Sequence, residues 1–178
     1  MARPLRLTAQ VLAVGLVAAL LALLIWRIAR NDKGVSQALL DGERPTAPAF
    51  DLKRLDGQGR IDLASIRGKK PIVLDFWASW CVPCIHESKR LEAARKKYGD
   101  RIEFIGVDTK DLSSDARTWQ RRHGITYPSV HDGSGNELTK WGGLPIPKIY
   151  FVDRSGKVVG ELQAEEDLPR YLRQIASS

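Results

Sequence analysis

One short stretch of the chain carries most of the information about its architecture: residues 74–84 read LDFWASWCVPC. The apolar residues from Ile72 to Phe76 predict a short buried strand. Pro83 then favours the first turn of a helix that runs to Tyr98 and ends at Gly99. The two cysteines of this stretch therefore lie where a strand ends and a helix begins.

This position suits thiol chemistry, because the free N–H groups and partial positive charge at a helix start stabilise a thiolate. We expect Cys81 to be the exposed cysteine, at the N-cap, and Cys84 to lie one turn further in. Cys81 would attack a substrate disulfide, and Cys84 would resolve the mixed disulfide that forms. The pair is thus expected to be a redox-active disulfide.

Two carboxylates are candidate bases for the proton of Cys84. Asp75 lies on the apolar strand, six residues before Cys81, and Glu87 follows Cys84 by three residues on the same helical face. Either could have a raised pKa and accept the proton through a water. The alternatives are that Glu87 is a partner of the helix dipole and that Asp75 is a hydrogen-bonded polar group of the core.

The remaining pattern is typical of an α/β domain. A hairpin is predicted before the first strand, around the turn at residues 56–59, and helices are predicted from Ser113 to His123 and from Asp167, as N-cap, to Ala176. Further strands are predicted over residues 102–107, 148–152 and 157–162. This order indicates a mixed central sheet flanked by helices.

The motif at residues 74–84 resembles the active-site signature of the thioredoxin superfamily, and other details are similar to its membrane-anchored TlpA/ResA/CcmG branch. The matching residues are Ala47-Pro-Ala-Phe50, Leu55-Asp-Gly57, Arg67-Gly-Lys69, Glu87 and Tyr127-Pro-Ser-Val130. The match covers roughly residues 45–165. It implies a thioredoxin-like fold and thiol–disulfide exchange with protein substrates outside the cytoplasm, often with apocytochrome c during cytochrome c maturation.

The resemblance also implies a substrate-binding surface. It places a cis-proline at Pro147, which would present the backbone of Ile146 beside Cys81 to a substrate strand. Trp80 and Pro83 are expected to complete this surface. An ordinary trans turn at Pro147 is the alternative.

Three residues depart from the pattern of that branch. Lys89 stands where the branch usually has a proline, so the helix should lack a kink there. Asp75 stands where the branch often has Asn, which gives this chain a second candidate base. Pro145 stands where a Gly is usual, which alters the loop of the substrate surface.

The N-terminal part has the pattern of a membrane anchor. Residues 7–26 carry no charge and are apolar on every face, and a helix of this length spans about 30 Å of hydrocarbon. We expect a tail over 1–6, a transmembrane helix in the lipid bilayer over 7–26, a tether over 27–44 and the thioredoxin-like domain over 45–178. A cleaved signal peptide is disfavoured, because no small-residue cleavage site follows the apolar run.

Basic residues on both sides of the apolar run leave its orientation open. Because disulfide exchange suits an oxidising compartment, we expect the domain on the periplasmic side of the cytoplasmic membrane. A membrane thiol protein that donates or accepts electrons is then an expected partner.

Composition restricts the other classes of function. The chain has 28 Lys+Arg and 21 Asp+Glu, but much of the basic excess flanks the apolar run, which disfavours nucleic-acid binding. Two cysteines exclude a disulfide-rich scaffold and a four-cysteine zinc site. A copper- or metal-binding module that uses Cys81, Cys84 and His86 is an alternative, as is a purely structural disulfide. No cofactor is expected.

Overall fold

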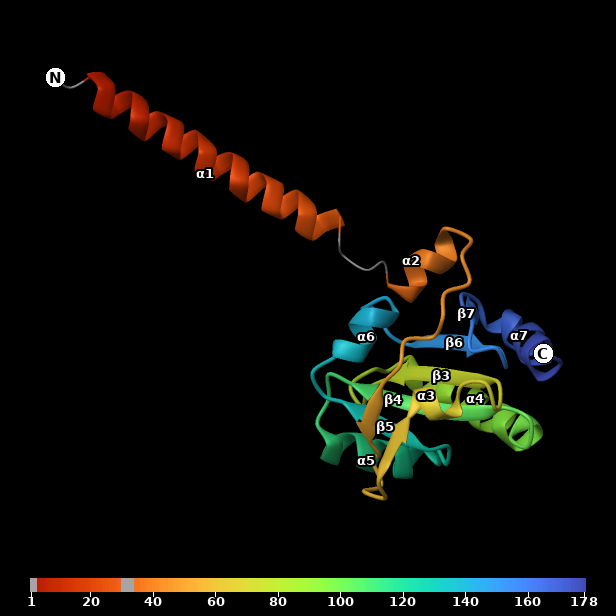
Figure 1. Cartoon of the computed structure of the whole chain (residues 1–178). Coiled ribbons are helices and arrows are strands. Elements are labelled where there is room, and N and C mark those ends of the chain that lie inside the picture. Colours follow the sequence, from red (N-terminus) through yellow and green to blue (C-terminus); the bar gives the residue numbers. More distant parts are fainter. Residues whose placement is uncertain (1–2, 30–33) are drawn as a thin grey trace. The chain divides into compact units, whose positions relative to one another are not determined.

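The computed structural model describes residues 3–29 and 34–178, and its side chains over residues 12–26 and 34–178 (Figure 1). It divides into two units, which are treated separately: helix α1 (Arg3–Ala29) and the folded unit that follows. Among the described residues, no helix has both the length and the apolar content needed to cross a bilayer. Residues 1–2 of the expected tail, 30–33 of the expected tether and the side chains of 7–11 in the expected anchor lie outside the described residues.

A five-stranded mixed sheet forms the centre of the folded unit, as predicted. The strand order is β5-β4-β3-β6-β7; the first three are mutually parallel, and β6 and β7 run antiparallel to their neighbours. The central strand β3 is buried along its whole length, because it has a strand on either side and helices on either face. The strands are β3 (Ile72–Trp77), β4 (Glu103–Thr109), β5 (Ser129–Asp132), β6 (Lys148–Val152) and β7 (Val158–Glu161).

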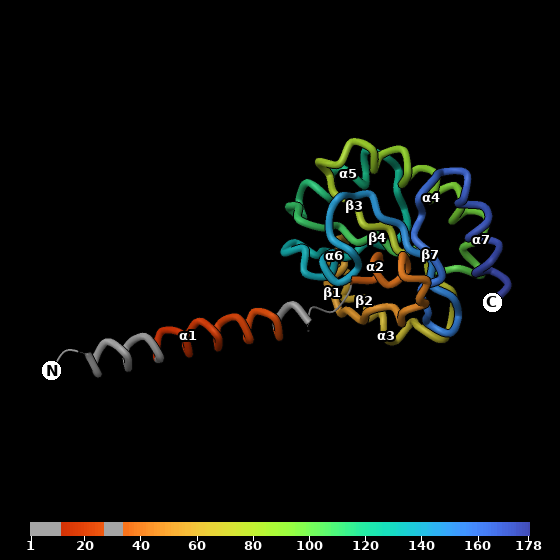
Figure 2. Tube along the Cα trace, turned by 90° about the horizontal axis from the view of Figure 1, so that it is seen from above, coloured from red at the N-terminus to blue at the C-terminus, as the bar shows by residue number. Residues whose placement is uncertain are grey.

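The helices cover the two faces of this sheet in separate layers (Figure 2). Right-handed crossovers between the parallel strands place α4 and α5 on one face, where α7 joins them after a short 3₁₀ turn. The layer comprises α4 (Cys84–Tyr98), α5 (Ser113–His123), η1 (Glu165–Asp167) and α7 (Leu168–Ala176). The opposite layer comprises α2 (Val35–Leu40), the hairpin β1 (Asp51–Lys53) and β2 (Arg60–Asp62), α3 (Leu63–Ile66) and α6 (Asn136–Trp141).

Most predicted elements are confirmed, and their termini follow the expected residues. Helix α4 ends before Gly99, and α5 ends before Gly124, whose φ of 67° is left-handed and therefore favours glycine. Asp167 precedes α7 as predicted, but its side chain does not cap the helix and instead accepts hydrogen bonds from Arg170.

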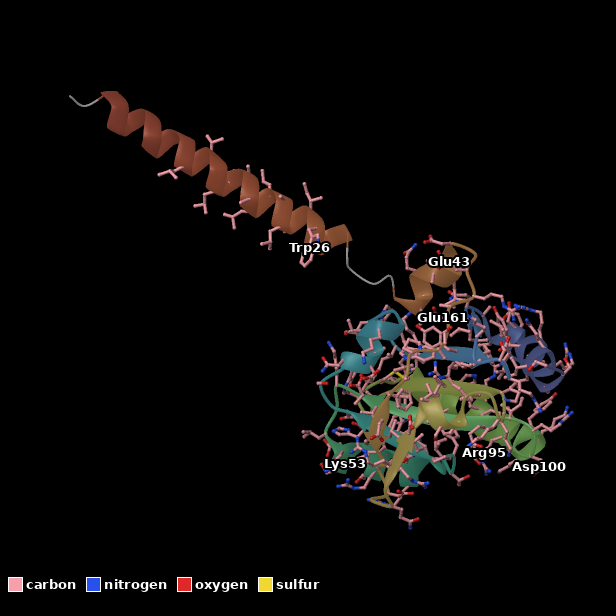
Figure 3. The ribbon with its side chains drawn as sticks, viewed as in Figure 1. Trp26, Glu43, Lys53, Arg95, Asp100 and Glu161 are labelled. Atoms are coloured by element: carbon pink, nitrogen blue, oxygen red, sulfur yellow. A yellow bond between two sulfur atoms is a disulfide. The ribbon has the colours of Figure 1, made fainter. Side chains whose placement is uncertain are left out.

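The expected tether over 27–44 is wrong for its second half, because residues 35–40 form helix α2 and pack on the folded unit. The hydroxyl of Ser36 donates to the carboxylate of Glu161 (2.6 Å), and it lies 3.1 Å from the carbonyl of Trp141 and 2.8 Å from the hydroxyl of Tyr150. Figure 3 shows Glu161 at the sheet edge next to α2, among the side chains that fill the folded unit. The folded unit therefore begins before residue 45.

Candidate redox-active site

Cys81 and Cys84 are joined by a disulfide, with their Cα atoms 5.4 Å apart. Pro83 is the N-cap of α4, so Cys84 is the first helical residue and Cys81 lies just before the helix. The prediction that Cys84 lies one turn inside is therefore wrong by most of a turn. The pair still lies where β3 ends and α4 begins, as the sequence predicts.

Cys81 is only 4% exposed, although the sequence predicted it to be the exposed cysteine, and Cys84 is 0% exposed. Its sulfur lies 3.8 Å from the carbonyl oxygen of Ile146, and this contact from the opposite loop covers it. Around this buried sulfur the neighbouring side chains Trp80 and Val82 are 53% and 76% exposed. The disulfide thus lies at the bottom of an apolar rim.

The cis peptide expected at Pro147 is present, and a second one precedes Pro145. Ile146 lies between the two prolines, is buried, and directs its carbonyl toward Cys81. Pro147 is half-buried, and Pro83, between the two cysteines in the sequence, is exposed. The expected surface residues therefore come from two segments that meet at Cys81, although their role in substrate binding stays a prediction.

Asp75 is buried on β3 and has two hydroxyl donors. Tyr127 donates to its Oδ2 at 2.6 Å and Ser88 donates to the same oxygen at 3.1 Å, while Oδ1 has no partner among the described residues. Burial raises the pKa of Asp75 to about 6; the two hydroxyls oppose this rise, and Glu87 adds slightly to it. The alternative that Asp75 is a hydrogen-bonded polar group of the core therefore holds for Oδ2 only.

Glu87 lies in the first turn of α4 and is almost completely buried. Burial raises its pKa, and the guanidinium of Arg90, 3.6 Å away, opposes the rise. Arg90 itself is held more closely by Glu165, at 2.7 Å, so its charge is shared. Glu87 Oε2 has no hydrogen-bond partner among the described groups.

Two residues of this site were not predicted, namely Tyr127 and Ser88. Ser88 follows Cys84 by four residues, and that spacing is the signal that places both on one face of α4. Tyr127 lies 52 residues from Asp75, and only the parallel pairing of β3, β4 and β5 brings it close.

Trp80 is oriented by the neighbouring loop. Its Nε1 donates to the carbonyl of Lys110 at 3.1 Å, which leaves the ring half-exposed beside Cys81. Trp77, in contrast, is fully buried and stacks on Trp119 with ring centroids 4.4 Å apart. Of the two tryptophans in the motif, only Trp80 is placed to touch a substrate.

The described part of the chain contains no group of three or more His, Cys, Asp or Glu arranged to hold a metal ion. His86, a ligand in the metal-binding alternative, has a largely exposed side chain and its ring nitrogen lies 3.4 Å from a carboxylate oxygen of Glu165. The two cysteines of that alternative are bonded to each other.

The sequence is similar to proteins that are named for thiol–disulfide exchange. Residues 44–160 match the model of the AhpC/TSA family. The thiol-disulfide oxidoreductase ResA of Bacillus thuringiensis subsp. konkukian is 29% identical over 133 residues, which cover 72% of this chain and 76% of ResA. The thiol:disulfide interchange protein HelX of Rhodobacter capsulatus is 30% identical over 131 residues, which cover 73% of this chain and 72% of HelX.

Solved structures show the same architecture. The MTB protein dsbF, determined in mixed oxidised and reduced forms, is similar with a TM-score of 0.66 and 25% identity, over 74% of this chain and 98% of dsbF. A secreted thiol-disulfide isomerase from Corynebacterium glutamicum is similar in fold, with a TM-score of 0.68 and 19% identity, over 78% of this chain and 89% of that one.

Proposed function

Because the chain belongs to the AhpC/TSA family and is a thiol-disulfide oxidoreductase of the ResA and HelX type, we propose that it reduces disulfides of protein substrates from a membrane-tethered position outside the cytoplasm. The observation that carries the proposal is the Cys81–Cys84 disulfide at the start of α4, with the carbonyl of Ile146 at its rim.

In the proposed reaction the reduced cysteines give two electrons to the substrate. The Cys81 thiolate attacks one sulfur of the substrate disulfide, an S–S bond to Cys81 forms, and the first substrate thiolate leaves. The Cys84 thiolate then attacks the Cys81 sulfur, which restores the Cys81–Cys84 disulfide and releases the second substrate thiolate. Cys84 is fully buried and Cys81 is 4% exposed beside the rim, so we assign the attack on the substrate to Cys81.

We assign the proton of Cys84 to Asp75. Ser88, on the same helix face as Cys84, contacts Asp75 directly, and the free Oδ1 can accept a proton through a water. With a pKa of about 6, Asp75 is mostly ionised at neutral pH. This pKa is also close enough to 7 for the carboxylate to accept and release a proton. Glu87 remains the second candidate base, acting in part through its charge on Asp75.

The rim around the disulfide supports a polypeptide substrate. Among residues 34–178 the largely exposed big apolar side chains are those of Trp80, Val82, Leu112, Leu144 and Leu40. Trp80 and Val82 adjoin Cys81, Leu144 precedes the cis peptides, and Leu112 follows the loop that binds Trp80. An extended segment that carries a cysteine pair between apolar residues fits this rim, and we propose apocytochrome c as such a client.

The proposed location rests on the N-terminal sequence. The uncharged residues 7–26 support an anchor in the cytoplasmic membrane, and the disulfide chemistry supports a periplasmic domain that is recharged by a membrane thiol protein. An alkaline phosphatase fusion after residue 35 tests the topology: an active fusion is expected, and an inactive one contradicts it.

The catalytic proposal is tested by trapping. Cys84→Ser should accumulate mixed disulfides through Cys81 with a peptide that contains the Cys-x-x-Cys-His sequence of apocytochrome c in oxidised form. The double variant Cys81→Ser/Cys84→Ser is the control and should trap nothing. Recovery of no adduct from Cys84→Ser on a non-reducing gel would overturn the assigned roles.

A further inference from the structure

A second cluster of buried charged groups lies beside the redox site and is not used by the reaction above. Asp108 on β4 is fully buried and pairs in the ladder with Trp77 on β3 and with His131 on β5. Its Oδ2 lies 2.6 Å from Nδ1 of His131, while its Oδ1 has no hydrogen-bond partner among the described residues. The His131 side chain is 30% exposed, so its ring connects the buried carboxyl with solvent.

Hydrogen bonds join this cluster to the segment that carries Cys81. Asp111 accepts the backbone N–H of Ser79 at 2.5 Å and its hydroxyl at 3.0 Å. Next to it, the carbonyl of Lys110 accepts the indole N–H of Trp80 at 3.1 Å. Three hydrogen bonds therefore fix residues 79–80 to the loop after β4, immediately before Cys81.

That loop has a backbone conformation that must be maintained by its neighbours. Lys110 has a φ of 50°, which is unusual for a residue with a side chain. Its backbone N–H donates to the carbonyl of Asp132 on β5 at 3.2 Å, and its side chain lies against Gly135, where a Cβ atom would meet it at 2.4 Å. The loop is thus held from β5 and from the start of α6.

The charges around Asp108 are almost all negative. Asp111 accepts three hydrogen bonds from Ser79 and Leu112, and Asp132 accepts the backbone N–H groups of Glu137 and Leu138. From β3 the neighbour is Trp77, which does not titrate, and on α6 Glu137 is paired with Lys140. A third carboxylate charge at Asp108 would be buried beside two others.

One proton shared between the His131 ring and Asp108, whose Nδ1 and Oδ2 atoms are 2.6 Å apart, would leave this pair with no net charge. Burial, then Asp111 and Asp132, raise the pKa of Asp108 to about 9, consistent with a proton that the pair keeps at neutral pH. Loss of that proton would place a negative charge against Asp111 and weaken its hold on Ser79.

We propose that Asp108 and His131 are positioning residues of the redox reaction, which share one proton and thereby let Asp111 hold the Ser79–Trp80 segment in register with Cys81. The proposal concerns residues outside the thiol and base assignments above.

The test uses the full chain in detergent micelles, labelled with ¹⁵N and kept in the disulfide form, in which the cysteines do not titrate. The signals of the Ser79 amide and the Trp80 indole N–H are followed from pH 6.5 to 11. In the native chain both should move together in the alkaline part of this range. In Asp108→Asn, which cannot lose a proton at this position, both should stay constant.

Two further variants sharpen the test. His131→Leu removes a ring N–H that stabilises the ionised carboxyl, so the midpoint should rise by about one pH unit. His123→Leu, which removes a histidine at the end of α5, is the matched control and should titrate as the native chain does. In the reduced enzyme, kcat/KM should fall about threefold relative to Asp108→Asn over the same alkaline range.

Constant signals in the native chain, or signals that move equally in Asp108→Asn, would overturn the proposal. An unchanged midpoint in His131→Leu would remove His131 from it. Because these signals are read without substrate, such a result leaves the proposed disulfide reduction intact.

Discussion

Asp75 and Asp108 are buried aspartates on the adjacent strands β3 and β4, and their neighbours give them different properties. Asp75 accepts hydrogen bonds from two neutral hydroxyls, which stabilise its carboxylate and limit the rise of its pKa to about 6. Asp108 faces two further carboxylates, and its pKa rises to about 9. Burial is the first cause in both, so the neighbouring groups decide which aspartate exchanges protons at neutral pH and which one retains its proton.

The largest expected difference between the two aspartates is kinetic. Asp75→Asn should slow resolution of the mixed disulfide by about a hundredfold at pH 7, because general-base catalysis contributes this much or more. Asp108→Asn should change the same rate by less than about twofold at pH 7, because the native pair already carries its proton. Rapid-quench kinetics with an oxidised protein substrate measures both, and equal effects would erase the distinction.

Stability should distinguish the same pair of variants. For both aspartates the folded-state pKa lies above the usual 3.8, so the folded chain binds the proton more tightly than the unfolded chain. Stability is therefore lost as pH rises from about 4 through about 6 for Asp75, an effect on the order of 3 kcal/mol. For Asp108 the loss continues toward pH 9.

Urea unfolding of the oxidised chain at pH 5, 7 and 9 measures this effect. Relative to the native chain, the free energy of unfolding of Asp75→Asn should increase mainly between pH 5 and 7. That of Asp108→Asn should continue to increase, relative to the native chain, up to pH 9. Native and variant curves that stay parallel over all three pH values would show that neither carboxyl has a raised pKa.

Tyr127→Phe tests whether the hydroxyl donors set the behaviour of Asp75. Without the hydrogen bond at 2.6 Å the pKa of Asp75 should rise, so the acid limb of the pH–rate profile should move up by about one pH unit. Exchange should then slow about fivefold at pH 6 and little at pH 8. Tyr98→Phe, at the end of α4, is the matched control. A pH–rate profile that does not move would show that Tyr127 does not set the pKa of the catalytic base.

The smallest effect is expected from Glu87→Gln. Among the causes that raise the pKa of Asp75, the charge of Glu87 contributes least. Its removal should therefore lower this pKa slightly, move the acid limb of the pH–rate profile slightly downward and change the rate by about twofold. A loss as large as that of Asp75→Asn would instead identify Glu87 as the base.

The sequence was sufficient for the parts of this site that depend on local pattern. The apolar run before the motif, with Pro83 and Gly99 around one helix, predicted β3 and α4 because strand burial and helix ends are read from nearby residues. Strand β5 and helix α6 were not predicted, because neither stretch shows a clear hydrophobic periodicity or a helix start signal of its own.

The contacts that tune the two aspartates could not be predicted from local pattern. Tyr127 and His131 reach Asp75 and Asp108 across 52 and 23 residues of sequence, through a strand that was itself missed. The burial of Cys81 was also missed, because it depends on a contact with the loop at Ile146, which is distant in the sequence. Helix α2 was read as tether because only Val35 and Ala38 of its six residues are buried.

Docking of α2 also bears on where the chain can be shortened. Lys148 and Glu161 form an ion pair at 2.7 Å against Ser36, and Gly142 leaves just enough room for that hydroxyl. A fragment that starts at residue 45 would strip this cover and open the flank of β6 and β7 to water, close to the loop that ends in Pro147. A fragment that starts at residue 34 keeps the cover, and so is the better starting material for crystals or spectroscopy.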